Sequence, residues 1–144
     1  MMFRKLPLIL SSMLVVISCK EENTECTVLR GFFPNSKDPS VVLYANDTPI
    51  DTVYLDKDKN FIFNLKIKES QLYNFETKGK FQYVFIEPND SLVVYANAYN
   101  FDESISFSGR GAAINNFILV QANEARREAD LFKKYQSLPP NLYK

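Results

Sequence analysis

The sequence of 144 residues contains no histidine and no tryptophan, and it has only two cysteines and four glycines. Without histidine, the chain cannot form a Ser-His-Asp or Cys-His nucleophilic site, a histidine-ligated zinc site or a histidine pH switch. It also lacks an excess of positive charge, since 17 basic residues balance 17 acidic residues. A nucleic-acid-binding domain needs a basic face, so this balance argues against nucleic acid as a partner.

The N-terminal residues have the pattern of a secretory signal that ends in a cysteine. Arg4 and Lys5 give a basic start, and the apolar run that follows is short for a membrane span. The run ends in Val-Ile-Ser-Cys at 16–19, which resembles a bacterial lipobox. In lipoproteins the signal is cleaved before the cysteine, whose thiol then receives diacylglycerol. We therefore expect a signal peptide at 1–18 and a lipid anchor on Cys19; the alternative is a plain cysteine after a signal that is cut elsewhere.

A short polar stretch separates this cysteine from the rest of the chain. Residues 19–25 contain no run of apolar side chains, so we expect a lipidated N-terminus and a polar tether there. The order Lys-Glu-Glu at 20–22 is similar to a lysine-acidic export signal of some Gram-negative lipoproteins. A plain solvated linker explains the same three residues.

Alternating apolar residues dominate the segment 26–110. Phe61, Phe63 and Leu65 fall on one face of an extended chain and Asn64 on the other, as in a half-buried strand, although Ile62 breaks the pattern. Eight such segments predict a mainly β domain, an antiparallel β-sandwich or barrel-like sheet, followed by one helix. The segments are 27–33, 41–45, 52–55, 61–67, 72–77, 81–86, 91–96 and 104–107.

Two local features of these segments lead to more specific expectations. The segment 81–86 is apolar on both faces, which predicts a central strand. The turn at 56–60 contains no glycine, and we expect Asn60 to adopt the left-handed conformation that a glycine usually takes in such a hairpin.

The period changes after Gly109-Arg110-Gly111, which we interpret as a joint between a strand and a helix. An amphipathic helix is predicted over 111–136, with a C-terminal tail at 137–144 that begins before two prolines. Asn115 and Asn116 are poor helix formers near the helix start, where caps are needed. The apolar positions at helical spacing are Ile114, Ile118, Ala125, Ala129 and Phe132.

The side chains that could carry out chemistry do not form a convincing active site. The acidic pairs Asp56/Asp58 and Asp102/Glu103 suit solvated turns better than the facing carboxylates of a glycosidase. If Cys19 is lipidated, Cys26 has no partner for a disulfide, and we expect it to be a small apolar residue in the first strand. We therefore predict no catalytic, cofactor-binding or metal-binding residue and no enzymatic activity.

Aromatic residues are plentiful, with 12 phenylalanines and 8 tyrosines. Most of them occupy alternating strand positions, where core packing explains them. Tyr44, Tyr54, Tyr95 and Tyr99 are candidates for an exposed face that binds a glycan, a peptide or a partner protein.

Three segments, in this order, resemble a known family. Residues 50–63 resemble a hairpin with a turn before Phe-x-Phe, 87–92 (Glu-Pro-Asn-Asp-Ser-Leu) resemble a Pro-Gly-Asp-Ser-Leu turn, and 105–117 resemble a Phe-Ser-Gly-x-Gly segment. Together they look like the N-terminal β domain, of unknown function, of TlpA-like thiol-disulfide oxidoreductase lipoproteins of Gram-negative bacteria. The chain departs from the pattern at both turn glycines, which are replaced by Asn60 and Asn89.

The resemblance implies a non-catalytic accessory domain of a thioredoxin-like system, anchored to the outer membrane on its periplasmic or surface face. Family members carry their active dithiol in a following thioredoxin domain, which 1–144 does not contain. We expect a truncated or split member whose partner is a thioredoxin-like domain or an envelope protein. The alternative is a stand-alone surface lipoprotein that binds a glycan, a peptide or a partner protein.

Overall fold

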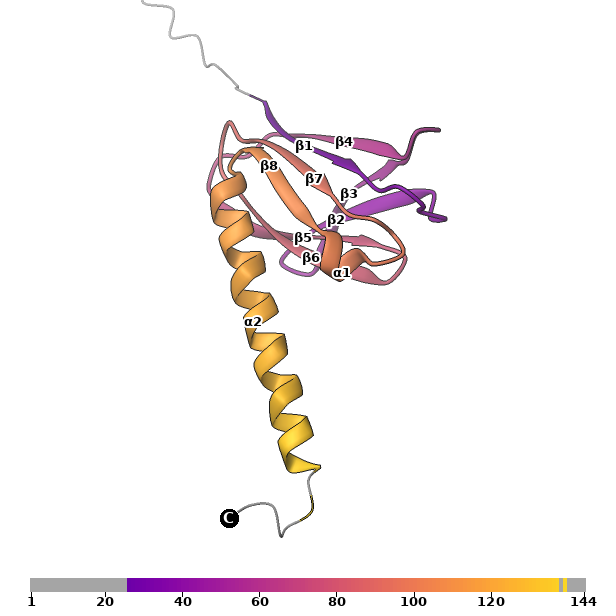
Figure 1. The fold of residues 1–144 in the computed structure, drawn as a ribbon. Coiled ribbons are helices and arrows are strands. Elements are labelled where there is room, and N and C mark those ends of the chain that lie inside the picture. Colours follow the sequence, from indigo (N-terminus) through magenta and orange to yellow (C-terminus); the bar gives the residue numbers. More distant parts are fainter. Residues whose placement is uncertain (1–25, 138, 140–144) are drawn as a thin grey trace, which may run out of the picture.

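The computed structural model describes residues 26–137 and 139 (Figure 1). The predicted signal peptide at 1–18, the anchor residue Cys19 and the rest of the tether at 19–25 lie outside the described residues. So does most of the predicted tail at 137–144.

The described part of the chain forms eight strands in two four-stranded sheets, followed by a long helix, which confirms the predicted fold class (Figure 1). One sheet has the strand order β4-β1-β7-β8, and the other has the order β3-β2-β5-β6. The strands are β1 (Thr27–Phe32), β2 (Ser40–Ala45), β3 (Thr48–Tyr54), β4 (Asn60–Leu65), β5 (Gln71–Thr77), β6 (Lys80–Ile86), β7 (Ser91–Tyr95) and β8 (Ser106–Arg110). The helices are α1 (Phe101–Ser104) and α2 (Ala112–Gln136).

Neighbouring strands are antiparallel with one exception, the pair of β1 and β7. In that parallel pair, Leu29 lies opposite Leu92, while on its other side Leu29 lies opposite Phe63 of β4. Parallel neighbours require a long connection. The whole β3-β2-β5-β6 sheet and strand β4 lie between β1 and β7 in the chain and provide it.

The core lies between the two sheets. Along the strands every second residue points inward, and several of these side chains are fully buried, among them Leu29, Leu43, Phe63, Phe75, Val84 and Leu92. Phe33 packs its ring against three others, with centroid distances of 4.9 Å to Phe61, 5.9 Å to Phe75 and 5.7 Å to Phe101. The alternation seen in the sequence therefore corresponds to the inner faces of a sandwich.

The expectation that 81–86 is a central strand was wrong. Strand β6 lies at the edge of its sheet and pairs only with β5 among the strands. Val84 and Ile86 point into the core, whereas the side chains of Phe81 and Tyr83 on the other face are each 57% exposed. Alternation shows that a face is apolar but does not show what covers it.

Three smaller expectations also need correction. The left-handed turn residue is Lys59, with φ 68°, because the Asp56 carboxylate accepts the backbone N–H of Asn60 at 2.8 Å and makes Asn60 the first residue of β4. Ser104 belongs to α1, and the last strand begins two residues later. Cys26 lies before β1 and is exposed, so it is not a buried residue of the first strand.

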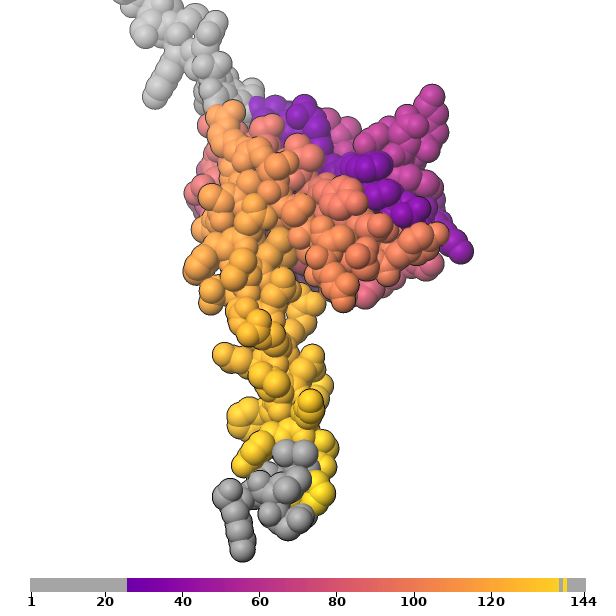
Figure 2. All heavy atoms as spheres, viewed as in Figure 1, coloured from indigo at the N-terminus to yellow at the C-terminus, as the bar shows by residue number. Residues whose placement is uncertain are grey.

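Helix α2 starts at one end of the sandwich, runs along the side formed by β6 and β8, and continues beyond the sheets (Figures 1 and 2). The predicted helix is confirmed, but its predicted packing face was wrong. Asn115 and Leu119 are the buried residues of the helix, whereas Ile114 and Phe132 are exposed. The predicted apolar stripe of the helix, with Ile114 and Phe132, therefore does not coincide with the face that packs against the sheets.

Candidate functional site

Asn115 attaches α2 to the edge of one sheet. Its side-chain oxygen Oδ1 accepts the backbone N–H of Phe85 at 2.8 Å, and its Nδ2 donates to the carbonyl of Phe85 at 2.8 Å. The same Nδ2 also donates to the carbonyl of Gly111 at 2.9 Å, and Asn115 is only 1% exposed. The amide thus pairs with Phe85 as the backbone of another strand would, at the edge strand β6.

Asn116 makes the same pair of bonds to the other sheet. Its Oδ1 accepts the backbone N–H of Phe107 in β8 at 2.9 Å, and its Nδ2 donates to the carbonyl of Phe107 at 2.8 Å. Two consecutive asparagines therefore bind the helix to both edge strands on this side of the sandwich.

The interpretation of these asparagines as helix caps was wrong. The N-cap is Gly111, at φ 92°, and no side chain makes a cap hydrogen bond there. A side chain at Gly111 would also collide with the carboxylate of Asp90. The segment Gly-Arg-Gly does form the predicted joint between strand and helix.

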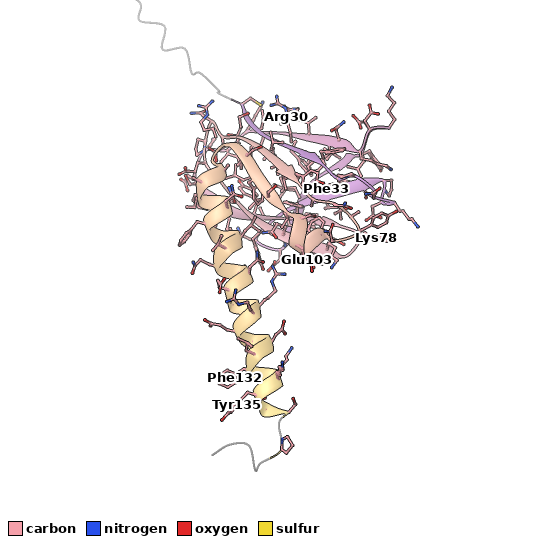
Figure 3. All side chains as sticks on the ribbon, in the orientation of Figure 1. Arg30, Phe33, Lys78, Glu103, Phe132 and Tyr135 are labelled. Atoms are coloured by element: carbon pink, nitrogen blue, oxygen red, sulfur yellow. The ribbon has the colours of Figure 1, made fainter. Side chains whose placement is uncertain are left out.

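The second part of α2 leaves the sandwich. Every residue after Leu119 to the end of the helix is exposed, and Figure 3 shows Phe132 and Tyr135 far from the sheets. Leu131 and Phe132 are large apolar residues there, and the side chain of Phe132 is 68% exposed. An isolated helical segment is marginally stable in water, and large apolar side chains grouped at a protein surface are common where proteins interact. We name the exposed apolar residues Leu131, Phe132 and Tyr135 the helix tip.

The four predicted tyrosines do not come together in one face. Tyr44 is half-buried in β2, and its hydroxyl donates to Oε2 of Glu76 at 2.9 Å, which raises the pKa of Tyr44. Tyr54 is exposed at the end of β3 in the same sheet. Tyr95 lies on the other sheet, with its ring centroid 5.9 Å from that of Phe32, and Tyr99 lies in the loop before α1.

The outer face of β5 and β6 carries exposed apolar side chains that the sequence reasoning missed. Leu72, Phe81 and Tyr83 are exposed there, and Tyr83 lies opposite Asn74 in the register of the two strands. The Oδ1 atom of Asn74 is buried and has no hydrogen-bond partner among the described residues. The sequence contained a signal for this surface, because both faces of 81–86 are apolar. One of these faces packs into the core, and the other is the exposed surface described above.

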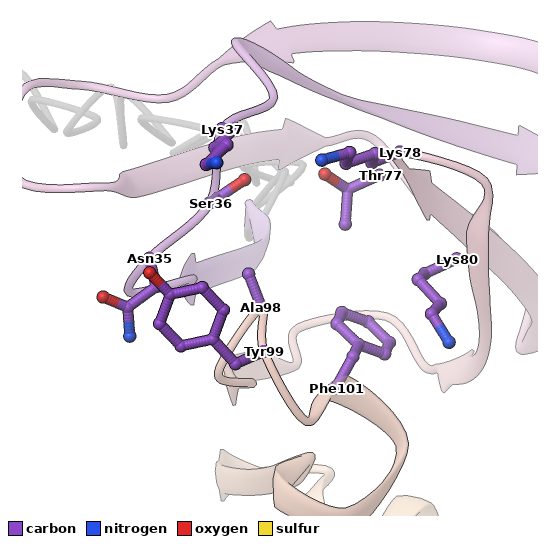
Figure 4. Close-up of a pocket in the computed structure, with 9 residues that line it drawn as sticks. All are labelled: Asn35, Ser36, Lys37, Thr77, Lys78, Lys80, Ala98, Tyr99 and Phe101. Atoms are coloured by element: carbon purple, nitrogen blue, oxygen red, sulfur yellow. The ribbon is translucent and has the colours of Figure 1, made fainter.

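A cavity of about 320 Å³ opens at the end of the sandwich opposite the start of β1 (Figure 4). The loop after β1, the hairpin between β5 and β6, and the segment before α1 form it. We name it the distal cavity; its lining residues are Asn35, Ser36, Lys37, Thr77, Lys78, Lys80, Ala98, Tyr99 and Phe101. Nζ of Lys80 forms an ion pair at 3.0 Å with Oδ2 of Asp102.

Comparisons with protein-family models, with curated proteins and with solved structures found no match for this chain. Over residues 26–137 and 139, no three side chains of the metal-binding types are grouped so that they could hold an ion. In the same part of the chain, no helix combines the length and the apolar character needed to cross a membrane.

Proposed function

We propose that this chain is a lipid-anchored, non-enzymatic β domain that serves a thiol-disulfide oxidoreductase system in the bacterial cell envelope. In this proposal α2 is the surface on which the thioredoxin-like partner or domain docks. The observation that carries the proposal is the second half of α2, in which every residue is exposed and which contains the apolar helix tip.

The attachment of α2 supports a role in positioning a partner. Four hydrogen bonds of 2.8–2.9 Å join Asn115 and Asn116 to the two edge strands. A helix held by both sheets at its base has a fixed direction, so a partner bound further along it has a defined orientation to the sandwich.

The sequence resemblance supports the kind of partner. The segments that resemble the TlpA-like family form strands β3 and β4, which lie in different sheets, with the turn that connects them, the turn before β7 and the joint at which α2 begins. In that family the helix connects to a thioredoxin domain. The one described thiol of this chain, Cys26, is exposed and has no disulfide partner among the described residues. Disulfide exchange would therefore use the dithiol of the partner.

The lipid anchor rests on the sequence of the first 19 residues. Val-Ile-Ser-Cys at 16–19 places a cysteine directly after an apolar run, and the sandwich begins at Thr27. A tether of a few polar residues would then separate the acyl chains from the folded domain. Two or more acyl chains on a single cysteine are sufficient to hold such a domain on a membrane.

A photo-cross-linking residue introduced in the producing bacterium tests the docking surface. It would replace Phe132 in one variant and Asp130 in a control variant, since positions two apart face nearly opposite sides of a helix. We expect the Phe132 position to give a covalent adduct with a protein or domain that contains a Cys-x-x-Cys pair, identified by mass spectrometry, and the Asp130 position to give much less. Adducts only with proteins that lack a dithiol, or equal labelling from both positions, would refute the proposal.

The anchor is tested separately by mass spectrometry of the mature N-terminus. We expect a chain that begins at Cys19 and carries acyl groups. An unmodified Cys19, or a mature chain that begins elsewhere, would refute the lipoprotein part of the proposal and leave the docking part open to its own test.

A further inference from the structure

The distal cavity has two chemically different walls. In Figure 4 the rings of Tyr99 and Phe101 lie on one side, and the side chains of Lys37 and Lys78 lie on the other. Tyr99 is 78% exposed, so its ring is available to a ligand, whereas Phe101 is buried and belongs to the core. The cavity volume of about 320 Å³ is within the range of small-ligand sites.

The lining of the distal cavity is positively charged. Three of its residues are lysines and none is acidic. Lys80 is paired with Asp102, but Lys37 and Lys78 have no ion pair or hydrogen bond to a described side chain. Two ammonium groups on one wall are therefore available to an anion.

Acidic side chains on the elements around the cavity, Asp38, Glu76 and Asp102, already accept hydrogen bonds or form an ion pair. Asp38 accepts the hydroxyl of Thr77 at 3.4 Å, and Glu76 accepts the hydroxyl of Tyr44 and the backbone N–H of Gly79. Glu103 lines an adjoining cavity together with Lys80 and Tyr99, and it does not line the distal cavity.

Neutral polar groups complete the site. The hydroxyl of Ser36 accepts the backbone N–H of Asp38 at 3.2 Å, but its own hydrogen has no acceptor among the described residues. Ser36 is only 7% exposed, so this donor is buried at the cavity instead of being directed into bulk water. Asn35 and Thr77 add an amide and a second hydroxyl to the lining.

We propose that the distal cavity binds an acidic sugar. The apolar C–H face of the sugar ring packs on Tyr99, its carboxylate pairs with Lys37 and Lys78, and its hydroxyl groups bond to the neutral polar side chains, including Ser36. An aromatic ring beside hydroxyl and amide groups suits a sugar, and the two ammonium groups that have no ion pair among the described residues favour an anionic sugar. This proposal goes beyond the docking role of α2 and does not depend on it.

The test is a titration of the folded protein, residues 20–144, with three probes, followed by calorimetry and by amide NMR shifts. The probes are trigalacturonate, its methyl ester, which removes only the charges, and triglutamate, which keeps the charges without the sugar ring. The variants are Lys37→Ala/Lys78→Ala, Tyr99→Ala and a control, Lys66→Ala/Lys68→Ala, which removes two exposed lysines outside the cavity.

We expect trigalacturonate to bind and to shift the amide signals of the distal cavity. Its Kd should rise about tenfold or more in the double lysine variant and in the tyrosine variant, and stay unchanged in the control. Added salt should weaken binding, because the ammonium groups are near the surface. Equal binding of the methyl ester, equal or tighter binding of triglutamate, or no binding of trigalacturonate would each overturn the proposal.

Discussion

Replacing Asn115 with alanine would remove three hydrogen bonds at a buried position. Oδ1 of Asn115 accepts the N–H of Phe85, and Nδ2 donates to the carbonyls of Phe85 and Gly111, all at 2.8–2.9 Å. A typical buried hydrogen bond contributes about 1 kcal/mol net, so the loss should lower the free energy of unfolding by about 3 kcal/mol. For a domain of this size that corresponds to roughly 10 °C in Tm.

Two further variants separate the hydrogen bonds from other effects. Asn123→Ala changes the same residue type in the exposed part of α2, where its Oδ1 accepts a hydrogen bond from Arg126. We expect its free energy of unfolding to stay within about 0.5 kcal/mol of the parent protein. Asn115→Asp keeps the shape and the acceptor oxygen but loses both Nδ2 donors and places a carboxylate beside two carbonyl oxygens. It should destabilise at least as much as alanine.

The assays are urea unfolding followed by circular dichroism and hydrogen exchange of the Phe85 amide. Exchange at Phe85 should become faster in Asn115→Ala and stay unchanged in Asn123→Ala. If Asn115→Ala unfolds at the same urea concentration as Asn123→Ala, or if the Phe85 amide exchanges at the parent rate, the side-chain attachment of α2 does not stabilise the fold and our reasoning is wrong.

Three other substitutions test separate parts of the structure. Gly31→Ala should destabilise by about 2 kcal/mol or more in urea unfolding, because a Cβ there would enter the space of the Phe61 ring; an unchanged midpoint would contradict the packing of β1 against β4. The backbone N–H of Asn60 holds the pKa of Asp56 below its ordinary value of 3.8, so the charged carboxylate stabilises the turn above that pH, and this contribution is lost as the pH falls through the lowered pKa. Asp56→Ala should therefore be less stable than the parent at about pH 7, and the difference should shrink as the pH falls below the ordinary pKa; a constant difference would contradict this. Phe132→Ser should leave the free energy of unfolding within about 0.5 kcal/mol of the parent, and a larger loss would mean that the helix tip is part of the core.

The strands could be predicted from the sequence because their inner faces follow a strict two-residue period. Phe61, Phe63 and Leu65 are buried on one face of β4, and the residues between them are exposed. The same rule misplaced β6, because Phe81 and Tyr83 are apolar but face solvent. Apolar alternation does not distinguish a covered outer face from an exposed one, so position within a sheet cannot be deduced from it.

The packing of α2 could not be predicted because it depends on polar side chains. The apolar positions such as Ile114 and Phe132 suggested a core-facing stripe, yet the face that meets the sheets is centred on Asn115 and Leu119. An asparagine in a helix usually indicates a terminus or a solvated position. Here Asn115 and Asn116 pair with the backbones of β6 and β8. These two strands come from different parts of the chain, so no local sequence pattern reveals the pairing.

For the candidate sites too, the sequence indicates suitable residues but not which of them lie together. Three of the four tyrosines chosen from the sequence are exposed, but their placement on different surfaces follows from the sheet order. The distal cavity joins Lys37, Lys78 and Tyr99 from three segments that are well separated in the chain. Such a group becomes visible only when the register of β5 with β6 and the path of the loop after β1 are known.

The direction of α2 has a geometric consequence. The N–H of Val28 donates to the carbonyl of Asp90 at 2.9 Å, and Gly111, just before α2, lies against the side chain of the same Asp90. The chain therefore begins its first strand and its last helix at the same end of the sandwich. With 25 residues, α2 is roughly 37 Å long. If the end of the sandwich at which β1 begins faces a lipid surface, the length of the helix limits how far from that surface the C-terminal end of α2 can lie.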